Sequence, residues 1–150
     1  MVDILVLKQK MSQLAEYLVD LQELKNDSEL TWIQFKSDKK IRRYTERTLH
    51  LAIECCLDIG GHIIADEGFR EPRNNRDIFL VLCENEIIAE ESLVPLQRMA
   101  QFRNILVHDY AKLDADIVYS IIEKHLLDII CFAGDIRNTF LGENESDIDS

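Results

Sequence analysis

The chain has 150 residues, 47% of them hydrophobic, with two prolines, five glycines and a formal net charge of −11 at pH 7. This composition suits one folded domain with a real core, whereas the negative charge opposes tight nonspecific binding of nucleic acid. No apolar run approaches the roughly 18 residues of a membrane span, and lysines interrupt the first apolar segment, which excludes a signal peptide, so we expect a soluble, cytoplasmic protein without a membrane partner.

The first half of the chain predicts two long helices. Apolar residues recur at steps of three and four over 4–21, the pattern of an amphipathic helix with a narrow apolar face. Residues 26–28 break this pattern, and a short apolar turn at 30–35 leads into a second helix over about 38–65. Gly60-Gly61 weakens this helix, because a glycine costs about 1 kcal/mol relative to alanine. The buried side of the second helix is expected to hold Ile41, Tyr44, Thr48, Leu51, Cys55, Ile59 and Ile63.

The second half predicts three more helices. After a loop at 66–75, a short helix should cover 76–83. Pro95 fits the first turn of a fourth helix, where its missing N–H costs nothing. Asp114 or Asp116 then opens a fifth helix. The packing side of the fifth helix is expected to hold Val118, Ile121, Ile122, Leu126, Ile129 and Ala133.

These elements predict an all-α fold, because no alternating strand pattern of useful length occurs. We expect an up-down bundle of about five helices, formed by residues 1–140, followed by an acidic, disordered tail at 141–150. The straight apolar face of the first helix also favours a homodimer. The four cysteines lack the spacing of a zinc site or a disulfide framework, and no convergent set of carboxylates and histidines is evident, so neither a metal nor a cofactor is expected.

Basic residues are concentrated in two short segments of this acidic chain. Residues 36–47 contain six lysines and arginines against two acidic residues, a local net charge of +4. A second cluster consists of Arg70, Arg73 and Arg76. Most of these side chains are expected on solvated helix surfaces, but the first segment can still guide a phosphate backbone locally.

The fourth helix carries the most informative polar residues: Arg103, Asn104, His108 and Tyr110. At a rise of roughly 1.5 Å per residue they fall within about two turns. Arginine binds phosphate through a fork of donors that stays charged, and histidine exchanges protons near neutral pH. Arg103 and His108 therefore predict RNA cleavage in which an imidazole deprotonates the 2′-OH and a guanidinium stabilises the charged intermediate. A second acid is also needed, and a symmetric dimer can supply it.

The spacing of Arg103, His108 and Tyr110, with Asn104 after the arginine, resembles the HepT-like branch of the HEPN superfamily. The resemblance covers roughly 41–136. It implies a helical homodimer whose two motifs share one cleft and cut RNA without a metal. Arg103 and His108 would be catalytic and Asn104 would bind or orient the substrate. It also implies that the protein is a toxin, neutralised when a cognate MntA-like nucleotidyltransferase antitoxin transfers AMP from ATP onto Tyr110.

Two alternatives belong to other functional classes. A non-catalytic HEPN subunit that binds substrate for, or docks with, a nucleotidyltransferase fits the net charge of −11 better than RNA binding does. A helical dimer without any site leaves the Arg103–Tyr110 motif unexplained.

Glu54 and Asp58, four residues apart, either line a site or face solvent, and we expect the latter. His50, His62 and His125 are expected to be solvated or satisfied polar side chains outside any site.

Overall fold

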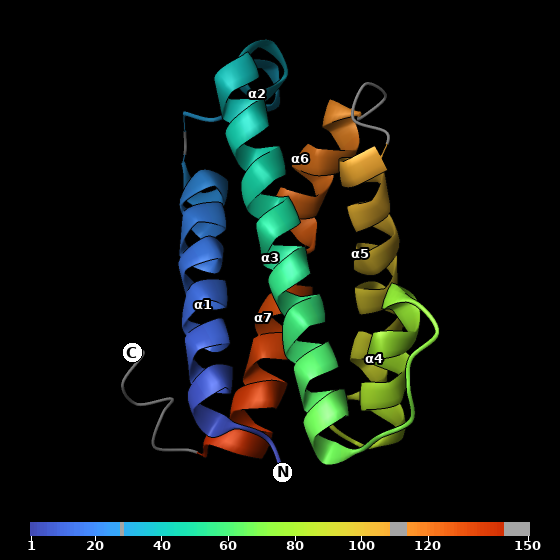
Figure 1. Cartoon of the computed structure of the whole chain (residues 1–150). Helices are drawn as coiled ribbons and strands as arrows, with labels where there is room; N and C mark the ends of the chain where they lie inside the picture. Colours follow the sequence, from blue (N-terminus) through green and yellow to red (C-terminus); the bar gives the residue numbers. More distant parts are fainter. Residues whose placement is uncertain (28, 109–113, 143–150) are drawn as a thin grey trace.

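The computed structural model describes residues 1–27, 29–108 and 114–142, without the side chains of residues 107 and 108. Within these ranges the protein is helical and has no strand, which confirms the predicted all-α bundle (Figure 1). The long elements are α1 (Ile4–Asn26), α3 (Lys39–Glu67), α5 (Glu90–His108) and the consecutive pair α6 (Ala115–Lys124) and α7 (Leu126–Ile136). The shorter ones are α2 (Trp32–Ser37), α4 (Asn75–Glu84) and the π-helical turn η2 (Arg137–Leu141).

Short polar side chains start several of these helices. Each accepts a hydrogen bond from a first-turn N–H that has no partner inside the helix. Asp114, one of the two predicted starts, accepts from the N–H of Asp116 at 2.9 Å. The helices α1, α3, α4 and α6 are capped in this way by Asp3, Asp38, Asn74 and Asp114.

The hydrophobic core follows the predicted apolar faces with a few exceptions. Ile4, the first residue of the predicted apolar face of α1, is 41% exposed. The buried residues of α1 are Leu7, Met11, Leu14, Leu18 and Leu21. On α3, Tyr44 was expected in the core but is 48% exposed. It lies towards α1, where burial of its hydroxyl and the charge of Asp20 raise its pKa. Four residues of the predicted α3 face are buried, namely Thr48, Cys55, Ile59 and Ile63.

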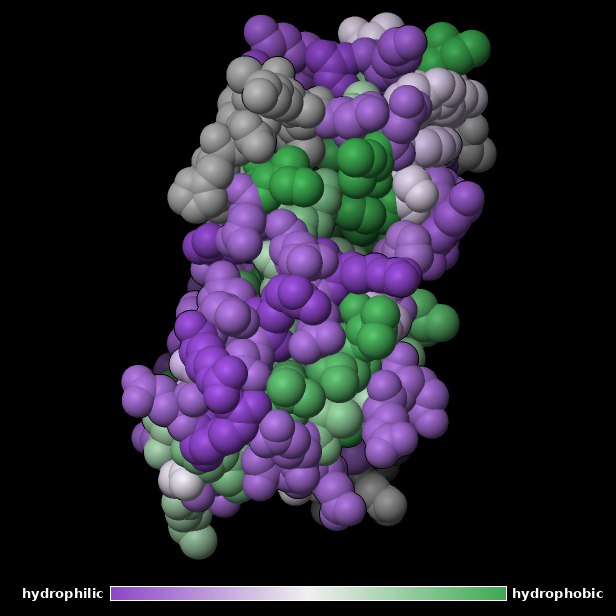
Figure 2. Space-filling model, turned by 90° about the vertical axis from the view of Figure 1, so that its right-hand side faces the viewer, coloured by the Kyte–Doolittle hydropathy of each residue, from purple (hydrophilic) through white to green (hydrophobic). Residues whose placement is uncertain are grey.

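The central helix α3 resembles a membrane-spanning helix in length and composition, alone among the described helices. However, 61% of its most apolar window is buried inside the bundle, as in the core helix of a folded domain. Some hydrophobic side chains remain on the outer surface, and Figure 2 shows such areas on the side of α5. Among the described side chains of α5 and α6, the exposed large hydrophobic residues are Val94, Ile105 and Ile117.

Three details of the predicted helices are wrong. Pro95 is inside α5 rather than in its first turn, because the helix begins at Glu90. Glu90 and Glu91 favour this earlier start, since carboxylates stabilise the positive end of a helix. The predicted fifth helix is divided at His125, whose ψ of 4° leaves the helical range. The apolar turn expected at 30–35 is largely the short helix α2.

Gly60 is required where α3 packs against α4. A Cβ at this position would lie 2.6 Å from Ile78 Cγ2 and 3.2 Å from Leu82 Cδ1. By contrast, a Cβ at Gly61 would have no atom within 4 Å. Gly60 therefore permits close packing, whereas Gly61 only weakens the helix.

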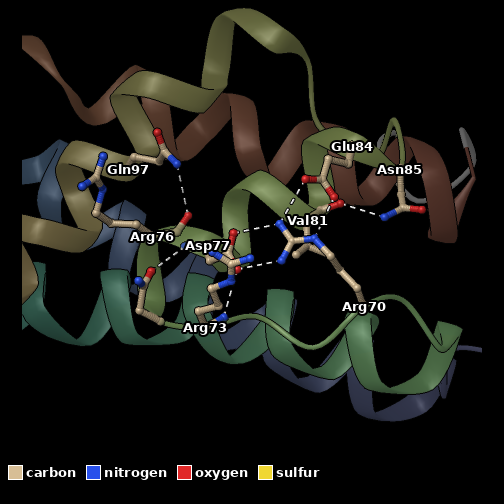
Figure 3. Close-up of polar contacts among 9 residues, drawn as sticks. Arg70, Arg73, Arg76, Asp77, Val81, Glu84, Asn85 and Gln97 are labelled. Carbon is tan, nitrogen blue, oxygen red and sulfur yellow. Dashed lines mark hydrogen bonds and ion pairs between the residues drawn. The ribbon is translucent and has the colours of Figure 1, made fainter.

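A salt-bridge cluster fixes the loop between α3 and α4 (Figure 3). The Nη1 and Nη2 atoms of Arg70 each donate to Asp77 at 2.8 Å, and its Nε and Nη2 atoms donate to Glu84 at 3.0 Å. The backbone N–H of Arg73 donates to the Asp77 carboxylate at 2.9 Å. These bonds, first from Arg70 and then from Arg73, hold the pKa of Asp77 well below its ordinary value. Arg70 therefore serves the fold, because two carboxylates already bind its guanidinium.

We expect Gly60→Ala and Gly61→Ala to have opposite effects on stability. Overpacking costs about 1–3 kcal/mol, more than the helix-propensity gain of about 1 kcal/mol, so Gly60→Ala should lower the free energy of unfolding. Gly61→Ala should raise it by about 1 kcal/mol. Urea denaturation of both variants provides the measurement. Equal stabilisation by the two substitutions would contradict the assigned packing role of Gly60.

The Arg70–Asp77 pair should make stability depend on pH. A carboxyl group whose folded pKa is lowered contributes stability that is fully present above its ordinary pKa of about 3.9 and disappears as pH falls towards the folded value. The wild-type melting temperature should therefore fall as pH is lowered from 5 to 3. Asp77→Asn should lower the melting temperature at pH 7 and flatten this acid dependence. Melting curves that stay parallel over this range would contradict the prediction.

Candidate functional site

The candidate site lies between α3 and α5. The first turns of α3 and the last turns of α5 lie at the same end of the bundle (Figure 1). From α5, Arg103 donates through Nε to Glu54 Oε1 on α3 and through Nη1 to Asn104 Oδ1 at 3.3 Å. The side chains of Arg103 and Glu54 are 23% and 29% exposed. The ion pair is thus partly shielded from water and partly open to it.

Two further residues of α3 extend this contact into a chain of polar groups. His50 Nε2 lies 3.4 Å from Glu54 Oε1, and Arg47 Nη1 lies 3.3 Å from His50 Nδ1. Because a guanidinium can only donate, Nδ1 is assigned as the acceptor and Nε2 as the protonated nitrogen that faces Glu54. We refer to Arg47, His50, Glu54 and Arg103 as the α3–α5 polar chain.

Glu54 fixes the orientation of the catalytic candidate Arg103. A guanidinium has five N–H groups, and the bonds to Glu54 and Asn104 use one each. The N–H groups that these bonds leave are available to an anion, and an arginine can donate two parallel hydrogen bonds to phosphate. The site can therefore present an oriented cation to a phosphodiester.

The predicted motif residues are only partly within the described region. Asn104 is exposed and bonds to Arg103, so these two residues lie together as expected. The backbone of α5 ends at His108, about 7.5 Å along the axis from Arg103 and about 140° around it. The side chain of His108 and the whole of Tyr110 lie outside the described residues.

Two residues of the polar chain were not assigned to a site from the sequence. Glu54 was expected to face solvent with Asp58, but it bonds to Arg103, and Asp58 alone is exposed. His50 was expected to be a solvated or satisfied polar side chain outside any site, and it joins Glu54 to Arg47 beside Arg103. The spacing of Arg47, His50 and Glu54 on one helix face was the signal that could have identified this group.

An apolar groove lies on the neighbouring face of α5. It has a volume of about 410 Å³ and runs between α5, α6 and the start of α7. Ile117 lines it and is 44% exposed, and Ile105 on α5 is 40% exposed. Apolar surface of this kind commonly marks a protein contact. Its other lining residues are Pro95, Arg98, Met99, Phe102, Ile121, His125 and Asp128.

Comparison with protein families and known proteins gives consistent matches. The model of the ribonuclease HepT-like family matches residues 7–136. The mRNA nuclease HepT of Shewanella oneidensis is 35% identical over 104 residues, which cover 69% of this chain and 78% of that protein.

Solved structures of similar proteins share the fold. The tri-AMPylated Shewanella oneidensis HEPN toxin, in complex with MNT antitoxin, is 30% identical with a TM-score of 0.79, and the match covers 92% of this chain and 99% of that one. The cytosolic Bacillus subtilis protein YutE is 26% identical with a TM-score of 0.80, covering 95% of both chains.

Proposed function

Because the chain belongs to the HepT-like ribonuclease family, we propose that it is the toxin of a toxin–antitoxin system and a metal-independent endoribonuclease. The observation that carries the proposal is Arg103, oriented by Glu54 between α3 and α5 at the end of the bundle where α5 reaches His108. Relatives support the reaction class, since the similar protein from Shewanella oneidensis is an mRNA nuclease.

In the proposed reaction, Arg103 binds the scissile phosphate and His108 deprotonates the neighbouring ribose 2′-OH. The 2′ oxygen then attacks phosphorus, and the bond from phosphorus to the 5′ oxygen breaks. The leaving oxygen takes a proton from a second acid. The guanidinium stabilises the extra negative charge on the phosphate oxygens as the bonds change. Asn104 holds Arg103 and orients the substrate.

A homodimer would supply the second acid from the partner's motif. The groove along α5 and the exposed Ile105 and Ile117 support such a contact, because they lie on α5 itself and on the helix that follows it. A two-fold axis there would bring two α5 helices together with their motifs facing one cleft. Each protomer would then provide a base or an acid in a given turnover.

Regulation by a nucleotidyltransferase antitoxin is the second part of the proposal. The similar Shewanella oneidensis toxin is AMPylated and bound to its MNT antitoxin, and another similar solved structure is a toxin–antitoxin with AMP-PNP. In this chain the acceptor would be Tyr110. The added phosphate would bring negative charge and bulk close to Arg103 and oppose binding of RNA. A cytoplasmic location fits these partners.

Removal of either catalytic side chain should abolish cleavage. Purified protein should cut RNA in the presence of EDTA, and Arg103→Ala or His108→Ala should each lower kcat by about 100-fold or more. Arg76→Ala, which removes a surface arginine outside the site, is the matched control.

Light scattering on the same samples should give the mass of a dimer. Unchanged cleavage in both variants would contradict the assignment. A wild type that is harmless in cells but binds the nucleotidyltransferase would indicate a docking subunit.

Tyr110 should be the site of modification. Co-expression with an adjacent nucleotidyltransferase gene should increase the mass of the wild type by one or more AMP units, and the modified protein should lose cleavage. Tyr110→Phe should gain no mass, whereas Tyr44→Phe, which removes a phenol that is 48% exposed, should be modified like the wild type. Intact-mass spectrometry distinguishes these outcomes. Equal added mass on Tyr110→Phe would assign the modification to another residue.

A further inference from the structure

One face of α3 carries a line of side chains that is basic at its start and ends at Glu54 in the candidate site. Lys40, Arg43, Arg47, His50 and Glu54 follow one another at steps of three and four residues. At about 100° per residue they occupy an arc of about 80° on the helix surface. The first three side chains are exposed and the last two are half-buried. The line therefore begins in solvent and ends at Glu54, the partner of Arg103.

Contacts join the end of this line to the site. Arg47 reaches the ring of His50 at 3.3 Å, and the other ring nitrogen of His50 faces Glu54 at 3.4 Å. One guanidinium is thus oriented on each side of a histidine–glutamate pair. Because His50 takes one of the five N–H groups of Arg47, an exposed anion can bind to the others.

Basic residues outnumber acidic ones in the first turns of α3, since residues 36–47 have a local net charge of +4. Asp38 is occupied as the cap of α3, where it accepts from the N–H groups of Lys40 and Ile41. Glu46 is half-buried at the edge of the face, and it lies near Arg43 and Arg42. The rest of the protein has a strongly negative net charge, so this face is a local positive surface on an acidic molecule.

We infer that Lys40, Arg43 and Arg47 bind backbone phosphates of the RNA strand adjacent to the bond that is cut. The inference rests on the proposed ribonuclease function and extends it from a catalytic pair to a path for the substrate. Arg43 and Glu54 are separated by about 16 Å along the helix axis, so these cations contact phosphates other than the one held by Arg103. Such contacts fix the position of the strand and read no sequence.

Binding of a fluorescent single-stranded RNA to the full-length His108→Ala protein tests this path without cleavage. The triple variant Lys40→Gln/Arg43→Gln/Arg47→Gln should bind about tenfold or more weakly, and its log–log salt slope should be shallower by about 2, since each phosphate contact on a single strand contributes about 0.7. Arg73→Gln/Arg76→Gln/Lys124→Gln is the control, because it changes the net charge equally at exposed positions away from this face. Glutamine preserves helix propensity, and thermal melting verifies folding.

Cleavage kinetics of the same triple variants with His108 intact provide the second readout. The ratio of kcat/KM for a long RNA to that for a dinucleotide should fall about tenfold in the α3 triple variant, because the dinucleotide lacks the flanking phosphates. Affinity and salt slope equal to those of the control triple variant would overturn the inference and leave the ribonuclease assignment intact. Loss of nucleotidyltransferase binding with unchanged RNA affinity would also overturn it and assign the face to a protein partner. Failure of the catalytic assignment itself would appear separately, as cleavage that survives Arg103→Ala and His108→Ala.

Discussion

The ion pair between Glu54 and Arg103 is the contact through which the bundle controls its candidate site. An arginine keeps its charge under all relevant conditions, so a half-buried guanidinium needs an anionic partner or a water-filled opening. Here it has both, with Glu54 at Nε and part of the side chain exposed to solvent. Partly exposed pairs add only about 0–1 kcal/mol to stability. The consequence of this pair is therefore mainly geometric, because it presents a fixed set of donors to an incoming phosphate.

The rest of the bundle places the two partners of that pair. Helix α3 is buried on one side along most of its length, and it exposes basic residues on another side in its first turns. Further along, Gly60 lets α4 pack closely against α3, and Arg70 fixes the connecting loop to α4. Helix α5 then returns beside α3 (Figure 1). Tight packing at one end of the bundle thus holds α3 and α5 in the register that brings Glu54 to Arg103.

Local patterns in the sequence were sufficient for much of the fold but not for the contact that organises the site. The apolar face of α1 and the cap at Asp114 each depend on residues close together in the chain, which periodicity and capping rules describe. Glu54 and Arg103 are 49 positions apart, and no local rule pairs them. The start of α5 before Pro95 was missed for a different reason, because Glu90 and Glu91 are a local signal that outweighs the preference of proline for the first turn. The break at His125 interrupts an apolar periodicity that continues across it.

The strongly negative charge of the chain is compatible with an RNA substrate once distance is considered. At physiological ionic strength charges are screened over about 8 Å, so a strand near α3 responds to the local cations more than to the total of −11. The acidic remainder of the surface repels RNA that approaches elsewhere. For the proposed ribonuclease, this arrangement would restrict productive binding to the face that leads to Arg103. The proposed modification would then weaken RNA binding by a single added phosphate, because few cations line the proposed path and each one would carry a large share of the local attraction.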